Sequence, residues 1–342
     1  MKVKNRAKFL LGAAGLAVLS FCLLSCASEQ EQIRKTEWQE LMSAAARMEQ
    51  ALMYSQSGAS SFDSHDYDSA IEALTEAINL FPDDIDNYAH RGDAYMYKGD
   101  YASAVNDFTT YINKDPDDAE AFYKRGLAYA NTENFSSSLS DFNQAIILDP
   151  TNTDAIANRG YVFFRQGDGY RAFQDMDQAI QLSPEDAVPY YLKGSANSQM
   201  GYYDKALPDF DKAIELNPNM VLAYLGRANI YRRRALSDVS FASLAISDYA
   251  QVLNLDPNQM QARLYRADLY RESGKTNEAA SDYNLVLKNT PHDVDALAGR
   301  GWCFLRLGLY ENARNDFTTA LQIAPGNLLA QEGIQSLTVQ GY

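Results

Sequence analysis

The chain has 342 residues, and its 45 acidic against 30 basic residues give a formal net charge of −15. A chain this acidic is a poor candidate for binding nucleic acid, or for being held on anionic lipid by charge alone. Its three cysteines, Cys22, Cys26 and Cys303, are too few for a disulfide framework.

The first 25 residues are predicted to be an export signal. Four basic residues within positions 2–8 precede an apolar run of 16 residues at 9–24, which is short for a membrane span of ~20 residues but normal for a signal peptide. The segment Leu-Leu-Ser-Cys at 23–26 resembles a bacterial lipobox, which implies that Cys26 becomes the lipidated first residue. Ala27 after it resembles lipoproteins sorted to the outer membrane, facing the periplasm. An ordinary secretory signal or an uncleaved anchor is the alternative.

Cleavage would leave 26 basic and 45 acidic residues, a net charge of −19. Residues 26–35 are polar and unpatterned, so we expect a tether that keeps the rest of the chain near its membrane. Residues 36–50 are predicted to form a helix, because Thr36 and Gln39 fit a capping box. We expect this helix to cap the segment that follows through one apolar face, which consists of Trp38, Leu41, Met42, Ala45 and Met48.

Eight prolines divide residues 51–327 into units of nearly equal length. They are 34 residues apart except for one interval of 39, and they are Pro82, Pro116, Pro150, Pro184, Pro218, Pro257, Pro291 and Pro325. Each unit contains two amphipathic helical segments, and one such hairpin cannot bury its apolar faces without stacking on copies of itself. The predicted repeats are 51–84, 85–118, 119–152, 153–186, 187–220, 221–259, 260–293 and 294–327, with a closing helix at 328–342.

Small residues recur within these units, with Gly or Ala at position 8 and Ala or Ser at position 20. They let the two helices approach closely. Aromatic residues occupy most of positions 11 and 24. The pattern resembles the tetratricopeptide repeat over about four-fifths of the chain. The resemblance implies an all-α fold, a right-handed superhelical solenoid of helix–turn–helix repeats.

In repeats two to eight, position 7 is basic and position 23 is Asp. The cations are Arg91, Arg125, Arg159, Lys193, Arg227, Arg266 and Arg300, and the carboxylates are Asp107, Asp141, Asp175, Asp209, Asp248, Asp282 and Asp316. An ion-binding or charge-relay site is one interpretation. We favour a structural salt bridge repeated at each helix junction, because architecture repeats through a whole array and function seldom does.

No residues are arranged for catalysis or for a cofactor. No phosphate-binding loop, nucleophile elbow or CxxC pair occurs. The run Asp-Ser-His-Asp-Tyr-Asp at 63–68 could form a metal cluster, but it aligns with a turn of the next repeat, and a solvated turn is favoured. Cys303 beside Trp302 is expected to pack as a small apolar residue. We predict no enzyme activity, no metal and no cofactor.

The resemblance implies that the first helices line a concave groove. Repeats two to five offer aromatic side chains there, and repeats four to eight offer cations near one tryptophan: Tyr97, Tyr123, Tyr161, Phe164 and Tyr191, then Arg165, Arg232, Arg233, Arg271 and Arg306 with Trp302. Arginines beside aromatic rings suit an acidic or C-terminal peptide. Alternatively, these arginines satisfy helix C-terminal carbonyls. Position 5 holds only Ala, Tyr or Leu in these repeats, so the carboxylate clamp of chaperone-binding relatives is not expected.

These patterns predict a membrane-anchored scaffold that binds proteins in the bacterial cell envelope through this groove. The rival prediction is an accessory lipoprotein of a transporter, which would hold a small anionic or aromatic solute. The sixth repeat carries five extra residues around 235–241, and we hypothesise that this longer turn contacts a partner.

Overall fold

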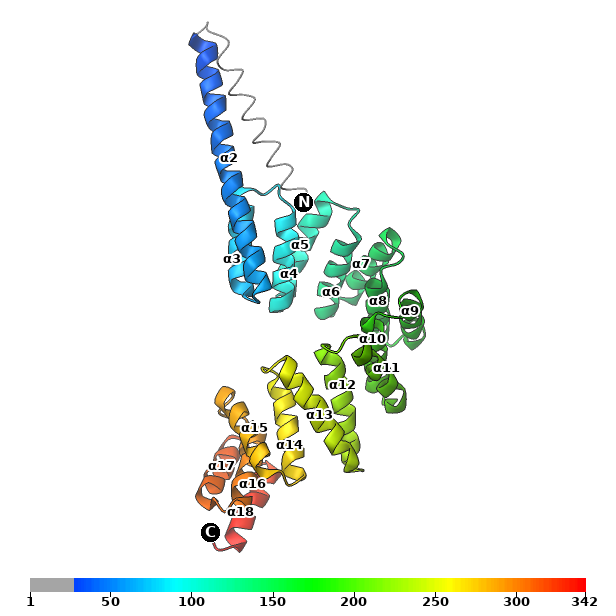
Figure 1. Cartoon of the computed structure of the whole chain (residues 1–342), viewed down its shortest axis with the longest axis vertical. Coiled ribbons are helices and arrows are strands. Elements are labelled where there is room, and N and C mark those ends of the chain that lie inside the picture. The colour runs from blue at the N-terminus through cyan, green and yellow to red at the C-terminus, as the bar shows by residue number, and fades with distance from the viewer. Residues whose placement is uncertain (1–27) are drawn as a thin grey trace. The chain divides into compact units, whose positions relative to one another are not determined.

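In the computed structural model, which describes residues 28–342, helices follow one another along the chain without any strand (Figure 1). The predicted signal peptide and Cys26 lie outside the described residues. The predicted all-α fold is confirmed. None of the described helices is long and apolar enough to span a membrane.

Each predicted repeat is a hairpin of two helices. The first helices are α2 (Ser28–Asp63), α4 (Asp86–Lys98), α6 (Ala119–Asn131), α8 (Thr153–Arg165), α10 (Ala187–Gln199), α12 (Val221–Ala235), α14 (Met260–Glu272) and α16 (Val294–Arg306). The second helices are α3 (Tyr67–Leu80), α5 (Tyr101–Lys114), α7 (Phe135–Leu148), α9 (Gly169–Leu182), α11 (Tyr203–Leu216), α13 (Ser240–Leu255), α15 (Thr276–Asn289) and α17 (Tyr310–Ile323). One more helix, α18 (Leu328–Val339), follows the last hairpin.

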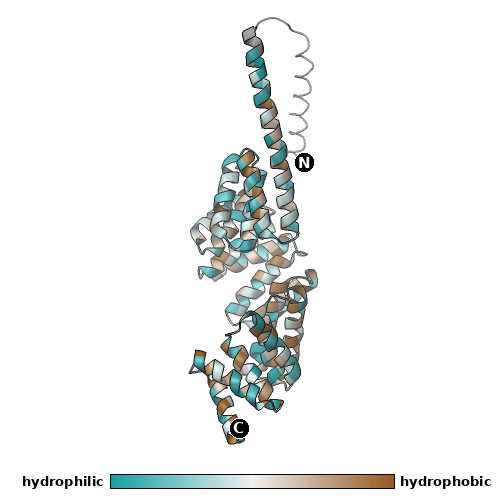
Figure 2. Ribbon diagram, turned by 90° about the vertical axis from the view of Figure 1, so that its left-hand side faces the viewer, coloured by the Kyte–Doolittle hydropathy of each residue, from teal (hydrophilic) through white to brown (hydrophobic). Residues whose placement is uncertain are grey.

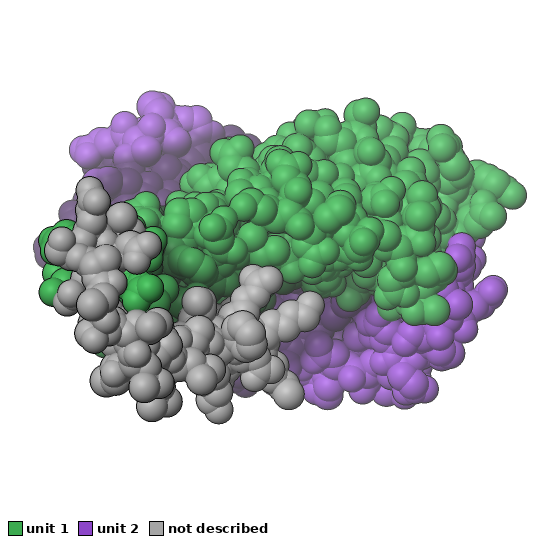
Figure 3. All heavy atoms as spheres, turned by 90° about the horizontal axis from the view of Figure 1, so that it is seen from above, with its two compact units in different colours: residues 1–175 green, residues 176–342 purple. Residues whose placement is uncertain are grey.

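The chain forms two compact units, which Figure 3 colours separately. Unit 1 ends at Asp175 and unit 2 runs from Met176 to Tyr342, so the boundary falls inside α9. Within each unit, successive hairpins stack, and the second helix of one repeat packs against the first helix of the next.

Residues in the left-handed conformation and N-cap side chains determine the turns between helices. Helix α4 ends at Gly99 with a φ of +81°, and Asp100 begins α5 by accepting a hydrogen bond from the Ser103 backbone N–H at 3.1 Å. His65 and Glu133 take the same left-handed conformation in the corresponding turns, with φ of 63° and 59°, at a cost of about 1 kcal/mol each. The acidic run 63–68 is therefore a turn that leads into α3.

The small residue at position 8 receives the large residue at position 24 of the same hairpin. A Cβ atom on Gly126 would lie 2.8 Å from Cε1 of Phe142, and Phe142 is fully buried. Ser138, which replaces the usual Ala at position 20, donates its hydroxyl to the Gly126 carbonyl at 2.8 Å. The pattern that defines the repeat is thus a contact between the two helices of one hairpin.

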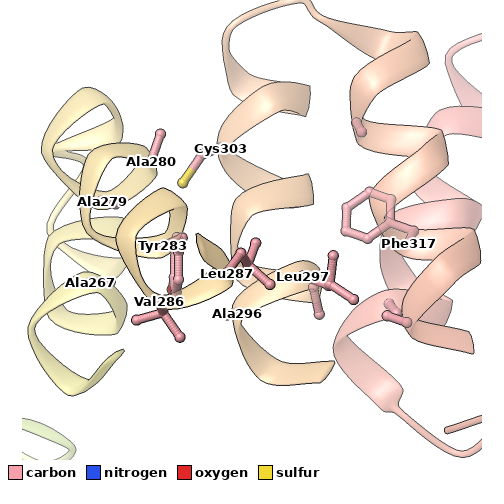
Figure 4. Close-up of a cluster of buried hydrophobic side chains, with 14 of the residues drawn as sticks. Ala267, Ala279, Ala280, Tyr283, Val286, Leu287, Ala296, Leu297, Cys303 and Phe317 are labelled. Carbon is pink, nitrogen blue, oxygen red and sulfur yellow. The ribbon is translucent and has the colours of Figure 1, made fainter. Parts of the chain in front are cut away.

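Figure 4 shows the same packing in unit 2, where Tyr283 and Phe317 lie among small aliphatic side chains. Cys303 is completely buried in this cluster, so it packs as the small apolar residue that the sequence predicted. Burial raises the pKa of its thiol to about 11.

The N-terminal end of unit 1 differs from the prediction. Residues 26–35 and 36–50 were predicted to form a tether and a separate helix, but the single helix α2 runs from Ser28 to Asp63. Thr36 is not an N-cap, because its hydroxyl donates to the Gln32 carbonyl inside the helix at 3.0 Å. The first 30 residues of α2 contain no glycine or proline, and their many Glu, Gln, Ala, Leu and Met residues favour continuous helix.

The first half of α2 also does not cap the first repeat. The described side chains before Ala51 are exposed or half-exposed, and Ala51 is the first buried residue of the helix. From there on, α2 packs against α3 as the first helix of repeat one. The apolar residues of the predicted capping face, among them Leu41 and Met42, remain at the surface.

The insertion in the sixth repeat lengthens both of its helices. Helix α12 has 15 residues and α13 has 16, against 13 and 14 in the other hairpins of unit 2. The turn between them carries Leu236 and Val239, which are 84% and 77% exposed.

Candidate functional site

The charged residues at positions 7 and 23 form a buried structural ladder, as the favoured interpretation predicted. The Arg125 guanidinium donates from Nε and Nη2 to both oxygens of Asp141, at 2.7 and 2.8 Å. The same two-bond geometry joins Arg91–Asp107, Arg159–Asp175, Arg227–Asp248, Arg266–Asp282 and Arg300–Asp316. These six pairs hold the two helices of a hairpin together, so they are not available for an ion or a partner.

The ladder also joins neighbouring repeats. Nη1 of Arg125 donates to Thr109 of the preceding second helix at 3.1 Å. Four other arginines reach the equivalent residue, position 25 of the preceding repeat, in the pairs Arg91–Thr75, Arg159–Asn143, Arg227–Asp211 and Arg300–Asn284. Each of these arginines therefore binds within its own hairpin and to the one before it.

The fifth repeat departs from this arrangement. Lys193 does not bond to Asp209 as predicted, but pairs with Asp177 of α9 at 2.7 Å, because one ammonium group cannot serve both sites as a guanidinium does. Asn197, which replaces the usual aromatic residue at position 11, donates to Asp209 instead at 3.0 Å. Burial raises the pKa of Asp209 above its usual value, and the charge of Lys193 partly opposes this shift.

The predicted aromatic groove residues of unit 1 lie on its first helices. Tyr123, Tyr161 and Phe164 are half-exposed, and the rings of Tyr161 and Phe164 are 6.1 Å apart. Tyr97 is 67% exposed and stacks on Tyr67 at 5.3 Å, at the end of the hairpin where the two helices are joined.

The cation predicted for this surface, Arg165, lies at the end of α8. It donates to Glu133 at 2.7 Å, and its guanidinium carbon is 5.4 Å from the centre of the Phe135 ring. Arg165 remains exposed, so its contacts hold it across the neighbouring turn without burying it.

In unit 2, Arg232 and Arg233 are consecutive residues in the last turn of α12, and their side chains contact different neighbours, Tyr265 of α14 and Tyr203 of α11. Arg232 stacks on Tyr265 of α14, with its guanidinium carbon 3.9 Å from the ring centre. Its Nε atom is buried and has no hydrogen-bond partner among the described residues. Arg233 donates to the Tyr203 hydroxyl and is exposed. Tyr191, the remaining aromatic prediction, is half-exposed on α10.

A second polar cluster surrounds Arg271 on α14. Tyr283 donates its hydroxyl to Asp268 at 2.6 Å and accepts from Nε of Arg271 at 3.3 Å. Burial raises the pKa of Asp268 above its usual value, although the bond from Tyr283 opposes the shift. Arg271 is thus a structural partner of the hairpin as well as a candidate groove residue.

Two groove candidates of the last repeat bond to backbone carbonyls. Nη1 of Arg306 donates to the Arg271 carbonyl at 2.5 Å, and Nε1 of Trp302 donates to the Leu329 carbonyl in α18 at 2.9 Å. Arg306 thus follows the alternative prediction, in which an arginine donates to a carbonyl at the C-terminal end of a helix.

Sequence reasoning missed the tyrosines that position these arginines. The two repeats with Arg at position 12 are the two with Tyr at position 24, namely Tyr249 and Tyr283. Each has an amide or carboxylate at position 9, and Tyr249 donates to Asn229 at 2.6 Å just as Tyr283 bonds to Asp268. This co-occurrence of three residue types was visible in the sequence.

Within residues 28–342, no group of three or more His, Cys, Asp or Glu side chains is placed to hold a metal ion. The candidate site is the surface formed by side chains of the first helices. All eleven predicted groove residues are exposed or half-exposed. In each unit they combine aromatic faces with guanidinium groups, which can bind a peptide chain by stacking and by paired hydrogen bonds.

Family models of the tetratricopeptide repeat match residues 90–153, 123–187, 234–293 and 264–327, and another such model matches 187–220. Together these matches span more than half of the chain. No curated protein matches it.

Several solved structures share the fold. The Cut9–Hcn1 hetero-tetramer of APC/C matches with a TM-score of 0.55 and 16% identity, over 82% of this chain and 54% of that one. The pilF protein of Pseudomonas aeruginosa matches with 0.54 and 19%, over 66% and 99%. The human IFIT1 dimer, solved with PPP-AAAA, matches with 0.54 and 16%, over 92% and 79%.

Proposed function

The chain belongs to the tetratricopeptide repeat family, whose members are scaffolds for protein–protein interaction, and from this premise we propose that it is a lipid-anchored scaffold in the bacterial cell envelope. Its partner would be a protein segment that carries carboxylates. The observation that carries this proposal is the contact between Arg232 and Tyr265, in which the guanidinium carbon lies 3.9 Å from the centre of the ring.

A guanidinium that stacks through its face directs its edge toward a ligand, and it binds carboxylates with two parallel hydrogen bonds. The stacked ring also fixes the arginine, so less side-chain entropy is lost on binding. Exposed Arg233 is the next residue of the helix; it reaches toward Tyr203 of α11 and adds a second positive charge to this end of α12. In a chain with excess negative charge, this pair would select an acidic segment over a basic one.

The membrane attachment and its sorting in the proposal rest on residues 1–27 alone. The lipobox-like segment ending at Cys26 would provide a lipid-bearing N-terminus, and outer-membrane sorting would follow from Ala27. Metabolic labelling with a radioactive fatty acid tests this directly. The wild type should incorporate label and Cys26→Ser should not, with Cys303→Ser as the control that keeps it.

The binding proposal is tested by cross-linked pull-down from envelope membranes. Wild type should capture a defined protein, and Arg232→Glu/Arg233→Glu should lose it. The control is Lys288→Glu, a charge reversal at an exposed position of α15, which should retain the partner. Equal capture by all three proteins would refute a site at these arginines.

If wild type captures nothing, a thermal-shift screen with small anionic and aromatic solutes becomes the decisive measurement. A solute that stabilises the wild type would favour the rival function, an accessory binding protein of a transporter. A groove site predicts that the Arg232→Glu/Arg233→Glu variant loses this response.

A further inference from the structure

The first half of α2, up to Gln50, presents its described side chains at or near the surface. No side chain described before Ala51 is buried, and Leu41 and Met42 are 37% and 47% exposed. Figure 2 shows apolar and polar residues alternating along this projecting half. Exposed helices of this length are marginal in water unless one face packs against something.

The apolar residues of this half follow the seven-residue period of a coiled coil. Trp38, Leu41, Ala45 and Met48 are spaced by three, four and three residues, which places them on one seam as alternating a and d positions. The outward positions of the same two heptads carry mostly polar residues, namely Gln39, Glu40, Ser43, Ala46, Arg47 and Gln50. A seam of this kind fits another helix of similar length.

We propose that the occupant is α2 of a second copy of the chain, packed antiparallel. In this arrangement each a residue faces a d residue, so Trp38 would meet Met48 and Leu41 would meet Ala45 of the other copy. These layers combine a large with a smaller or more flexible side chain, which fills space better than identical layers do.

Charge favours the antiparallel over the parallel pairing. The flanking e positions are Lys35, Met42 and Glu49. In an antiparallel pair Lys35 lies opposite Glu49 of the other copy, twice per dimer, and Met42 meets its own counterpart at the centre. In a parallel pair Glu49 would face Ala44 and neither charge would meet an opposite one.

The dimer would be weak, because the seam is only about two heptads long. Two copies attached to one membrane would nevertheless meet at a high effective concentration. The inference does not depend on the proposed partner groove, since α2 alone carries it.

Sedimentation equilibrium of the full chain in density-matched detergent tests the proposal. Wild type should dimerise reversibly, and Leu41→Arg, which buries a charge in the seam, should be monomeric. Lys35→Glu turns two attractive pairs into repulsive ones and should raise the dimer dissociation constant by roughly 4- to 30-fold.

The decisive variant is Lys35→Glu/Glu49→Lys, which restores both pairs in the antiparallel geometry and should recover the wild-type dissociation constant. Arg47→Glu, on the outward face, is the matched control and should leave it unchanged. The helical circular dichroism signal should stay constant throughout.

A wild-type chain that remains monomeric would overturn the proposal. A dimer that the double variant fails to restore would overturn the antiparallel geometry.

Discussion

Removing the carboxylate of Asp141 should destabilise the third repeat far more than removing a charge from an exposed pair. The Asp141 side chain is 7% exposed and that of Arg125 is 16% exposed. Asp141→Ala would leave the guanidinium half-buried with only Thr109 as a partner. Breaking a well-buried pair from one side costs about 3–5 kcal/mol, and the partial exposure of Arg125 reduces this to about 2–3 kcal/mol.

Hydrogen exchange measured on peptides from residues 119–152 is the suitable assay, because unfolding of a repeat array is local and a single global free energy is not well defined. At 1.4 kcal/mol per tenfold, exchange through local opening should accelerate roughly 30- to 150-fold in Asp141→Ala.

The control is Lys114→Ala. Lys114 pairs with Asp83 at 3.1 Å, with side chains 53% and 79% exposed, and the loss should be within about 0.5 kcal/mol. The double variant Arg125→Met/Asp141→Leu should recover most of the lost protection, since an apolar pair removes the desolvation cost. Equal effects of Asp141→Ala and Lys114→Ala would refute the reasoning that burial gives the ladder its strength.

Three further outcomes are expected. Because burial raises the pKa of Asp209 above 3.8, its ionised form costs stability once the pH rises through the folded value; Asp209→Asn should therefore raise the melting temperature at pH 7 and change it little at pH 3. Gly126→Ala should lower the melting temperature, because its Cβ meets Phe142 at 2.8 Å, whereas Gly169→Ala, with nothing within 4 Å, should not lower it. With a pKa of about 11 and a buried thiol, Cys303 should react with Ellman's reagent at pH 8 only when the protein is unfolded.

The hairpin architecture was predictable because it depends on contacts within about 34 residues. The proline period located each repeat, and the small residue at position 8 anticipated the close contact that Gly126 makes with Phe142. The recurrence of a cation at position 7 and an aspartate at position 23, such as Arg125 and Asp141, likewise predicted that these residues form ion pairs. The prolines and small residues recur in every repeat, and the charged residues recur from the second repeat on, so local chemistry and repetition agree.

Where a repeat deviates, the sequence was less informative. Lys193 was expected to pair with Asp209, but two carboxylates are available to its single ammonium group, and it forms its ion pair with Asp177. The continuity of α2 was missed because a capping box at Thr36 is a weak signal beside the high helix propensity of its surroundings.

The candidate surface was predicted only as a set of positions. That all eleven residues lie on first helices and reach the surface follows from the repeat register. The hydroxyl that engages Arg271 comes from Tyr283, on the other helix of the hairpin. Predicting such a contact requires knowledge of side-chain directions, which the spacing of residues alone does not supply.

The ladder has a consequence for how such a chain can evolve. A hairpin with Arg at position 7, Asp at position 23 and a hydroxyl, amide or carboxylate at position 25 contains both residues of the hydrogen bond that joins neighbouring repeats: the donor Arg and the acceptor at position 25. Its Arg donates a hydrogen bond to the preceding repeat, as Arg125 does to Thr109. Its position 25 accepts a hydrogen bond from the Arg of the following repeat, as Asn143 does from Arg159. Duplication, deletion or transfer of whole 34-residue cassettes would therefore leave every joint intact, and array length can change by unequal recombination without a compensating mutation.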